Sequence, residues 1–176
     1  MKYLICCMVL FSSLSNTIIF DFNKNSSINN WVVVDDVVMG GRSSGNFELD
    51  KEGNGVFYGS ISLKNNGGFS SLRHGFNKLM VDKFKTVVLK IKGDGKSFQF
   101  RIKHKSSDYA SYITSFSTSG DWQEIEIPIN NMYPSFRGRK LDEPNFSHES
   151  IEEVTFLIAN KKNEYFKLLI DKIELR

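Results

Sequence analysis

Short segments in which apolar and polar residues alternate recur along the chain, and they limit its fold more than any other feature. Residues 97–104 give the clearest case, in which three apolar residues alternate with three polar ones: Phe98, Phe100 and Ile102 against Gln99, Arg101 and Lys103. A period of two is typical of a strand with one buried face. Similar segments predict further strands at 18–22, 56–63, 86–92, 110–117, 122–129, 154–159 and 165–175. The sequence therefore predicts an all-β fold, a sandwich or jelly roll of two antiparallel sheets.

Two local patterns refine this prediction. Gly93-Asp94-Gly95 predicts a tight hairpin turn between the strands at 86–92 and 97–104, because Asp-Gly tolerates positive φ. Asp171-Lys172 interrupts the alternation of the last strand and indicates a bulge. Only residues 147–153, with serines as candidate caps, indicate a helical turn.

Length and charge narrow the class of protein. The chain has 176 residues, which fits one domain with a substantial core. Its 23 basic and 20 acidic residues leave a small, scattered excess of positive charge. This excess gives no electrostatic case for nucleic acid as a partner.

The first residues predict a signal peptide at 1–15, followed by a single domain at 16–176. Lys2 precedes the largely apolar segment 3–14, and Ser13-Leu14-Ser15 has the small-x-small form of a cleavage site. We therefore expect an exported protein, periplasmic or secreted. An uncleaved anchor is the alternative and the only expected membrane contact, although the segment is short for a span of about 20 residues. Cleavage would remove Cys6 and Cys7, the only cysteines, and with them any disulfide or thiol chemistry.

Two segments contain a glycine doublet in matched settings. The first glycine motif (residues 35–45) contains Gly40-Gly41, and the second glycine motif (residues 65–73) contains Gly67-Gly68; each also has apolar, serine and basic residues. Glycine loses the most backbone freedom on folding, so both places are expected to need unusual backbone angles or close backbone approach.

A structural and a functional interpretation compete for these motifs. Backbone N–H groups and Arg42 could bind an anion, but no helix or phosphate-loop pattern follows, which favours a structural turn. Arg73 could bind a carboxylate. Pairing of Asp36 with Arg73, which would lock the two motifs together, is the favoured interpretation.

Both motifs also resemble those of a known family. Trp31 followed by Asp36-Val37-Val38-Met39-Gly40-Gly41-Arg42-Ser43 resembles the W…D-x-V-M-G-G-x-S motif of the complex I intermediate-associated protein 30 family. Asn66-Gly67-Gly68-Phe69-Ser70-Ser71-Leu72-Arg73 is similar to its second motif, N-G-G-F-x-S-x-R. Later matches follow in order at 93–95, 122–128, 136–139 and 166–173.

The resemblance implies a galactose-binding-like β-sandwich in which Met39, Gly40, Gly41, Gly67, Gly68 and Phe69 are structural motif residues. Mitochondrial members of the family assist the assembly of respiratory complex I and bind other subunits rather than catalyse. We therefore expect a non-enzymatic protein-binding module that acts on an envelope or respiratory complex. The alternative is a carbohydrate-binding β-sandwich of an exported protein.

The expected contact surface joins the two glycine motifs and includes one tryptophan. Its candidate residues, for a protein partner or a glycan, are Asp36, Arg42, Ser43, Asn66, Arg73 and Trp122. Trp31 and Trp122 could stack on sugar rings, but a core position is favoured for each.

Catalytic and metal sites find little support in the sequence. No Gly-x-Ser-x-Gly elbow occurs, and paired carboxylates such as those of Glu124 and Glu126 are typical of a solvated strand face. We therefore predict no catalytic residue, no cofactor and no metal ligand. The three histidines, His74, His104 and His148, lack the spacing of metal ligands. The sequence does not decide whether the carboxylates of Asp108, Asp121 and Asp142 bind a calcium ion.

Overall fold

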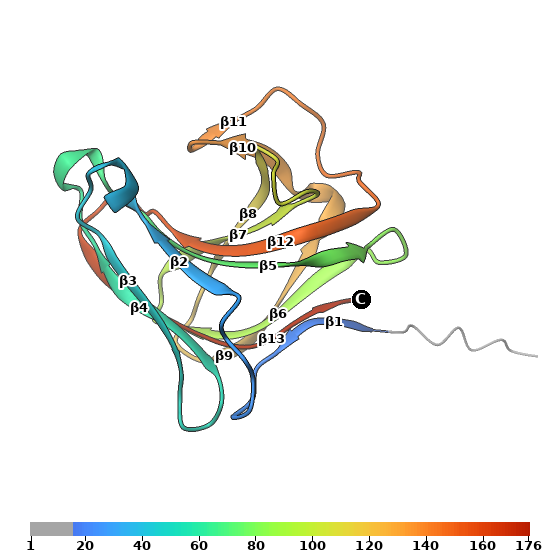
Figure 1. The fold of residues 1–176 in the computed structure, drawn as a ribbon, viewed down its shortest axis with the longest axis horizontal. Coiled ribbons are helices and arrows are strands. Elements are labelled where there is room, and N and C mark those ends of the chain that lie inside the picture. Colours follow the sequence, from blue (N-terminus) through green and yellow to red (C-terminus); the bar gives the residue numbers. More distant parts are fainter. Residues whose placement is uncertain (1–15) are drawn as a thin grey trace, which may run out of the picture.

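Two antiparallel sheets packed face to face contain nearly all the regular structure of residues 16–176, the part of the chain that the computed structural model describes (Figure 1). The six-stranded sheet has the order β3 (Ser44–Leu49), β4 (Gly55–Ile61), β13 (Glu164–Leu175), β6 (Thr86–Gly93) and β9 (Trp122–Pro128), with β1 (Thr17–Asp21) also paired to β13. The predicted signal peptide lies outside the described residues. The predicted all-β sandwich is confirmed.

The seven-stranded sheet forms the other layer. Its order is β11 (Arg139–Lys140), β10 (Tyr133–Phe136), β8 (Ser111–Ser117), β7 (Ser97–Lys103), β12 (Ser150–Ile158), β5 (Ser70–Met80) and β2 (Trp31–Asp35). Three short 3₁₀ helices connect strands: η1 (Asp36–Met39), η2 (Lys64–Asn66) and η3 (Ile129–Asn131). None of the helices in the described part of the chain has the length and hydrophobicity needed to cross a membrane.

The core lies between the sheets and follows the alternation in the sequence. Phe98, Phe100 and Ile102 of β7 are fully buried, as predicted. In β13 the register against β6 shifts between Ile170 and Lys172, which confirms the predicted bulge. The shift returns the following apolar side chains to the core, since one extra residue changes the face to which the strand points.

An aromatic cluster anchors the beginning of the domain to both layers. The ring of Trp31 in β2 stacks on His74 in β5, with centroids 4.5 Å apart and planes 10° apart. Phe20, Phe22 and Phe47 pack around the same indole at centroid distances of 5.2 to 5.5 Å. Trp31 is therefore a core residue, as the sequence favoured.

Three local predictions were wrong. β6 and β7 belong to different sheets, so Gly93-Asp94-Gly95 is a turn between layers rather than a hairpin, although Gly95 does have positive φ (83°). No helical turn forms at 147–153, because β12 begins at Ser150. Trp122 is 42% exposed rather than buried, since it begins the edge strand β9.

Candidate functional site

The carboxylate of Asp36 holds the two glycine motifs together. Asp36 is fully buried at the start of η1. Its Oδ1 accepts a hydrogen bond from the backbone N–H of Ser43 (2.9 Å), and its Oδ2 accepts one from the Ser43 hydroxyl (2.5 Å). Oδ2 also accepts the backbone N–H groups of Gly68 (2.5 Å) and Phe69 (3.2 Å). A single side chain thus links segments that are more than 30 residues apart.

These contacts correct the expected pairing of Asp36 with Arg73. The carboxylate is satisfied by the Ser43 hydroxyl and by backbone amides, and no ion pair joins it to Arg73 among residues 16–176. Burial acts to raise the pKa of Asp36, but the hydrogen bonds from Ser43, Gly68 and Phe69 outweigh burial and hold that pKa below its usual value. Asp36 does join the two motifs, as predicted, but through Ser43 and backbone amides rather than through Arg73.

Asp36 also explains why each motif contains two adjacent glycines. In each doublet one glycine has positive φ, 86° at Gly40 and 132° at Gly68. The other glycine packs on the Asp36 side chain, where a Cβ on Gly41 or Gly67 would meet the carboxylate oxygens. The doublets therefore supply both unusual backbone angles and close approach, as the sequence predicted.

A second set of hydrogen bonds reinforces this junction. The neighbouring Asp35 accepts the backbone N–H of Gly45 (2.9 Å) and the hydroxyl of Ser70 (2.5 Å), which joins β2, β3 and β5. The side-chain amide of Asn65 donates to the carbonyl of Gly40 (3.0 Å), which joins η2 to the end of η1. The two motifs therefore form one hydrogen-bonded wall at an end of the sandwich (Figure 1).

Beside this wall, the outer face of the seven-stranded sheet is hollowed into a cleft of about 650 Å³. Figure 1 shows β10 and β11 curling over this face, on the side away from the six-stranded sheet. The cleft extends from the second glycine motif to these strands. Its main lining residues are Met39, Asn66, Gly67, Gly68, Phe69, Arg73, Arg101, Lys103, Tyr109, Phe136, Arg137, Glu153, Thr155 and Leu157.

Strand register determines which side chains share the floor of this cleft. The middle row, across β2, β5, β12, β7, β8 and β10, consists of Val32, Arg73, Thr155, Arg101, Ile113 and Tyr133. Of these, Arg73, Thr155 and Arg101 line the cleft. Arg73 and Arg101 therefore flank Thr155 from the two neighbouring strands. In the row nearer the second glycine motif, Leu157 is the apolar floor residue.

The cleft is strongly basic. Arg73, Arg101, Lys103 and Arg137 line it, whereas Glu153 is the one carboxylate among its described lining residues. Desolvation lowers the pKa of Arg101 to about 10, and the nearby charge of Arg73 acts in the same direction. Within residues 16–176, none of the four cations forms a salt bridge.

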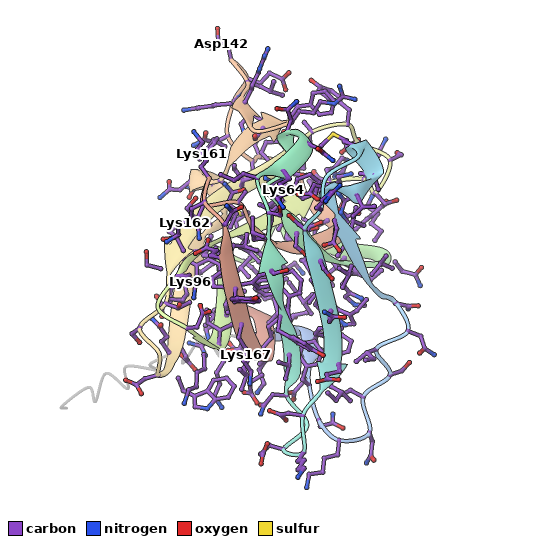
Figure 2. All side chains as sticks on the ribbon, turned by 90° about the vertical axis from the view of Figure 1, so that its left-hand side faces the viewer. Lys64, Lys96, Asp142, Lys161, Lys162 and Lys167 are labelled. Atoms are coloured by element: carbon purple, nitrogen blue, oxygen red, sulfur yellow. The ribbon has the colours of Figure 1, made fainter. Side chains whose placement is uncertain are left out.

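More positive charge lies at the adjoining end of the sandwich. Figure 2 looks onto this side, where Lys64, Lys96, Lys161, Lys162 and Lys167 are labelled. Lys161 and Lys162 follow closely on Ala159, which also lines the cleft. Lys96 and Lys162 are paired with Asp94 and Glu164. Lys64 and Lys161 form no salt bridge within residues 16–176, so these two add to the positive field beside the cleft.

Comparison with known proteins identifies the family. The model of the Complex I intermediate-associated protein 30 (CIA30) family matches residues 20–170. The chain belongs to this family. The relative from Mus musculus, "Complex I intermediate-associated protein 30, mitochondrial", is 25% identical over 89% of this chain and 55% of its own length. The Drosophila melanogaster relative of the same name is 23% identical, over 90% of this chain and 62% of its own length. The chain therefore spans little more than half of the curated CIA30 relatives that it matches.

Solved structures similar to this CIA30 domain include carbohydrate-binding modules. A Family 11 module from Clostridium thermocellum, in complex with a β-1,3-1,4-mixed-linked tetrasaccharide, superimposes with a TM-score of 0.69 at 19% identity, over 91% of this chain and 94% of the module. The Family 11 module of the cellulosomal cellulase Lic26A-Cel5E gives a TM-score of 0.70 at 18% identity, over 93% and 95%. At these identities the likeness shows a shared jelly-roll fold alone.

The structure brings together only some of the predicted site residues. Asn66 and Arg73 line the cleft, together with Met39, Gly67, Gly68 and Phe69. Asp36 and Ser43 are buried in the junction, so the contact with a partner predicted for them is corrected to a structural role. Arg42 is exposed outside the cleft lining, and Trp122 lies on the other sheet.

Histidine and carboxylate groups elsewhere do not assemble into a second site. His104 and His148 stack with centroids 4.3 Å apart, and Nε2 of His148 lies 2.9 Å from the hydroxyl of Tyr112. Among the described residues, no group of three or more His, Cys, Asp or Glu side chains is placed to hold a metal ion. Asp108, Asp121 and Asp142 are therefore not gathered around one position.

Proposed function

We propose that this CIA30 domain is a non-catalytic module that binds a protein partner through the basic cleft on the seven-stranded sheet. The cleft carries the proposal, because it is preformed, concave and built beside the residues that define the family's motifs. Its described lining contains no histidine and a single carboxylate, whose Oε1 accepts a hydrogen bond from Thr155 (3.2 Å). The lining therefore offers charge and shape for binding rather than an acid–base pair for hydrolysis.

An exposed apolar edge beside the cleft supports a protein as the partner. Val37, Val38 and Met39 of η1 are 59%, 72% and 63% exposed, and Met39 lines the cleft. Three consecutive large apolar residues at the surface are unusual in a monomer and typical of contact surfaces. The buried Asp36 junction holds this edge in place, so little conformational entropy would be lost on binding. The curated CIA30 relatives are named for association with an intermediate of complex I, which makes a protein complex the natural class of partner.

Site-specific photo-crosslinking would test the proposal. A benzophenone amino acid would replace Tyr109 or Phe136 at the cleft and, as a matched control, Tyr165, an 83% exposed aromatic residue on the other sheet. We expect one protein adduct from both cleft positions and none from Tyr165 in cells that make the full chain. Adducts that form equally from both faces, or from Tyr165 alone, would refute a cleft-bound partner.

A glycan is the second candidate ligand, favoured by the fold shared with carbohydrate-binding modules. Tyr109 and Phe136 would be the sugar-contacting rings, but their planes lie at 77° to each other and form no flat platform. Calorimetric titration with the mixed-linked tetrasaccharide would distinguish the candidates. Saturable binding that the change Phe136→Ala abolishes would favour the glycan.

We further propose that residues 1–15 direct export and that binding takes place outside the cytoplasm. Lys2, the apolar segment and Ser13-Leu14-Ser15 support this proposal. The intact mass of the protein isolated from its native cells would test it. We expect a chain that begins at or near Asn16, whereas a chain that retains Met1 and fractionates with the cytoplasm would refute export.

A further inference from the structure

The basic cleft also indicates which kind of protein segment it binds. We infer that its ligand is an extended acidic segment of polypeptide, whose carboxylates pair with Arg73 and Arg101 and whose apolar side chain packs on Leu157 and Phe69. This inference rests on the proposed function, because it names the chemistry of the partner at the same cleft.

The first argument is the state of the two arginines. Nε and Nη2 of Arg101 both donate to Oε1 of Gln99, at 3.2 and 2.6 Å, so its partner within the protein is a neutral amide. Arg73 lies across Thr155 from it, and the two like charges repel each other. Burying cations without a counter-charge costs free energy, which an incoming carboxylate would offset. Guanidinium groups suit this role, since they bind carboxylates through two parallel hydrogen bonds.

The second argument is the division of the cleft into a basic and an apolar part. Arg73 on β5, and Arg101 and Lys103 on β7, lie on the two strands that flank β12 in the middle of the sheet. Met39, Phe69 and Leu157 lie at the end next to the glycine motifs. A peptide that crosses the strands can present carboxylates to the first part and one apolar side chain to the second.

The third argument is the state of the rim aromatic rings, which are poorly arranged for sugar stacking. The guanidinium of Arg137 lies 5.2 Å from the centroid of the Phe136 ring and covers one face of it. The hydroxyl of Tyr109 donates to Glu143 (2.9 Å), which fixes that ring edge-on to Phe136. The rim therefore favours a charged, side-chain-bearing ligand over a flat sugar face.

A designed peptide would test the inference with the full chain. The probe is a fluorescein-labelled peptide in which glutamates alternate with glycines around one phenylalanine, and its control has glutamine in place of every glutamate. Fluorescence anisotropy should show binding of the acidic peptide, about tenfold weaker binding of the amide peptide, and loss of affinity in about 0.5 M salt.

Two pairs of substitutions would locate the binding. Arg73→Gln with Arg101→Gln should weaken binding of the acidic peptide by about tenfold or more. Lys92→Gln with Lys167→Gln removes the same charge outside the cleft and should change affinity by less than about twofold. If the arginine variant melts early by circular dichroism, Lys103→Gln with Arg137→Gln at the cleft provides the same test.

The outcomes separate this inference from the proposed function. The inference is overturned if the acidic peptide does not bind, if it binds equally to all variants, or if only a polygalacturonate oligomer or the neutral tetrasaccharide occupies the cleft. A second outcome is that the crosslinker at position 109 forms protein adducts while the chain binds the acidic peptide and its glutamine control equally. That outcome would leave the proposed function standing and overturn the acidic ligand. Absence of protein adducts at the cleft would overturn the proposed function itself.

Discussion

Asp36 is the residue on which the junction of the two glycine motifs depends. The change Asp36→Asn replaces a carboxylate oxygen, which accepts hydrogen bonds, with an NH₂ group, which does not. At least one of the backbone N–H groups of Ser43, Gly68 and Phe69 would then lose its acceptor. We expect a loss of about 2–4 kcal/mol in the free energy of unfolding at neutral pH, measured by urea denaturation. Asp142→Asn is the matched control, because Asp142 projects from an exposed turn (Figure 2), and it should cost less than about 0.5 kcal/mol. Equal stability of the two variants would contradict the assigned role.

The same carboxylate predicts a pH dependence. Its pKa is lower in the folded chain than the ordinary value of 3.8, so the folded state holds fewer protons than the unfolded state near that pH. The stability that it contributes is therefore complete above pH 3.8 and is lost as the pH falls through the lowered folded value. The difference in unfolding free energy between the wild type and Asp36→Asn should narrow in acid. A difference that stays constant from pH 6 to pH 2.5 would show that Asp36 is not charged in the fold.

Gly67 tests the close approach at the junction separately from backbone strain. A Cβ at this position would lie 2.5 Å from Oδ2 of Asp36, although the φ of −73° is ordinary. We expect Gly67→Ala to cost about 1–3 kcal/mol through overpacking. Gly75→Ala is the control, since a Cβ there meets nothing within 4 Å. Thermal unfolding of both variants would check the prediction, which fails if both melt with the wild type.

At the scale of elements, regular alternation with large apolar residues at the inward positions predicted strand bounds well. β6 and β7 were found within one residue at their ends for this reason. β13 was found equally closely although its bulge interrupts the alternation. The 11-residue β5 was missed, although Leu72, His74 and Phe76 alternate with small or polar residues. The second glycine motif obscured that pattern, since serine and glycine are typical of turns.

The cleft could not have been predicted from local patterns. Arg73, Arg101 and Thr155 are far apart in sequence and meet only through the register of β5, β7 and β12. The polar positions of β7 were expected to face water, and the curl of β10 and β11 converts that face into the floor of a cavity (Figure 1). The one local signal was the cationic character of outward positions in neighbouring strands, which becomes informative once the strand order is known.

The pairing of β2 with β5 predicts a second pH dependence. Burial lowers the pKa of His74 below 6.5, although the nearby carbonyl of Asn30 opposes the shift. The folded state thus prefers neutral His74, and its contribution to stability is full above pH 6.5 and decreases as the pH falls below it. His74→Phe keeps an aromatic ring on Trp31 and removes this titration. Melting temperatures from pH 7.5 to 5.5 should fall less for the variant than for the wild type, and parallel curves would contradict the prediction.

At the scale of the whole molecule, β1 completes the six-stranded sheet and the aromatic cluster that joins both layers. It pairs with the last strand, β13, and leads to Phe22, which is buried against Trp31 and donates its backbone N–H to the carbonyl of Asp171 (2.8 Å). A chain that begins at Asn16 keeps all these contacts and should fold cooperatively.

A chain that begins at Asn23 lacks β1 and Phe22 and should lose at least about 3 kcal/mol of unfolding free energy, a large part of the 5–15 kcal/mol typical of a domain. Circular dichroism melts of both chains would measure the difference, with Phe22→Ala in the longer chain as an intermediate case. Melting of the two chains at the same temperature would show that the sandwich is complete without β1, and would place the anchor of the aromatic cluster in β2 and β5 alone.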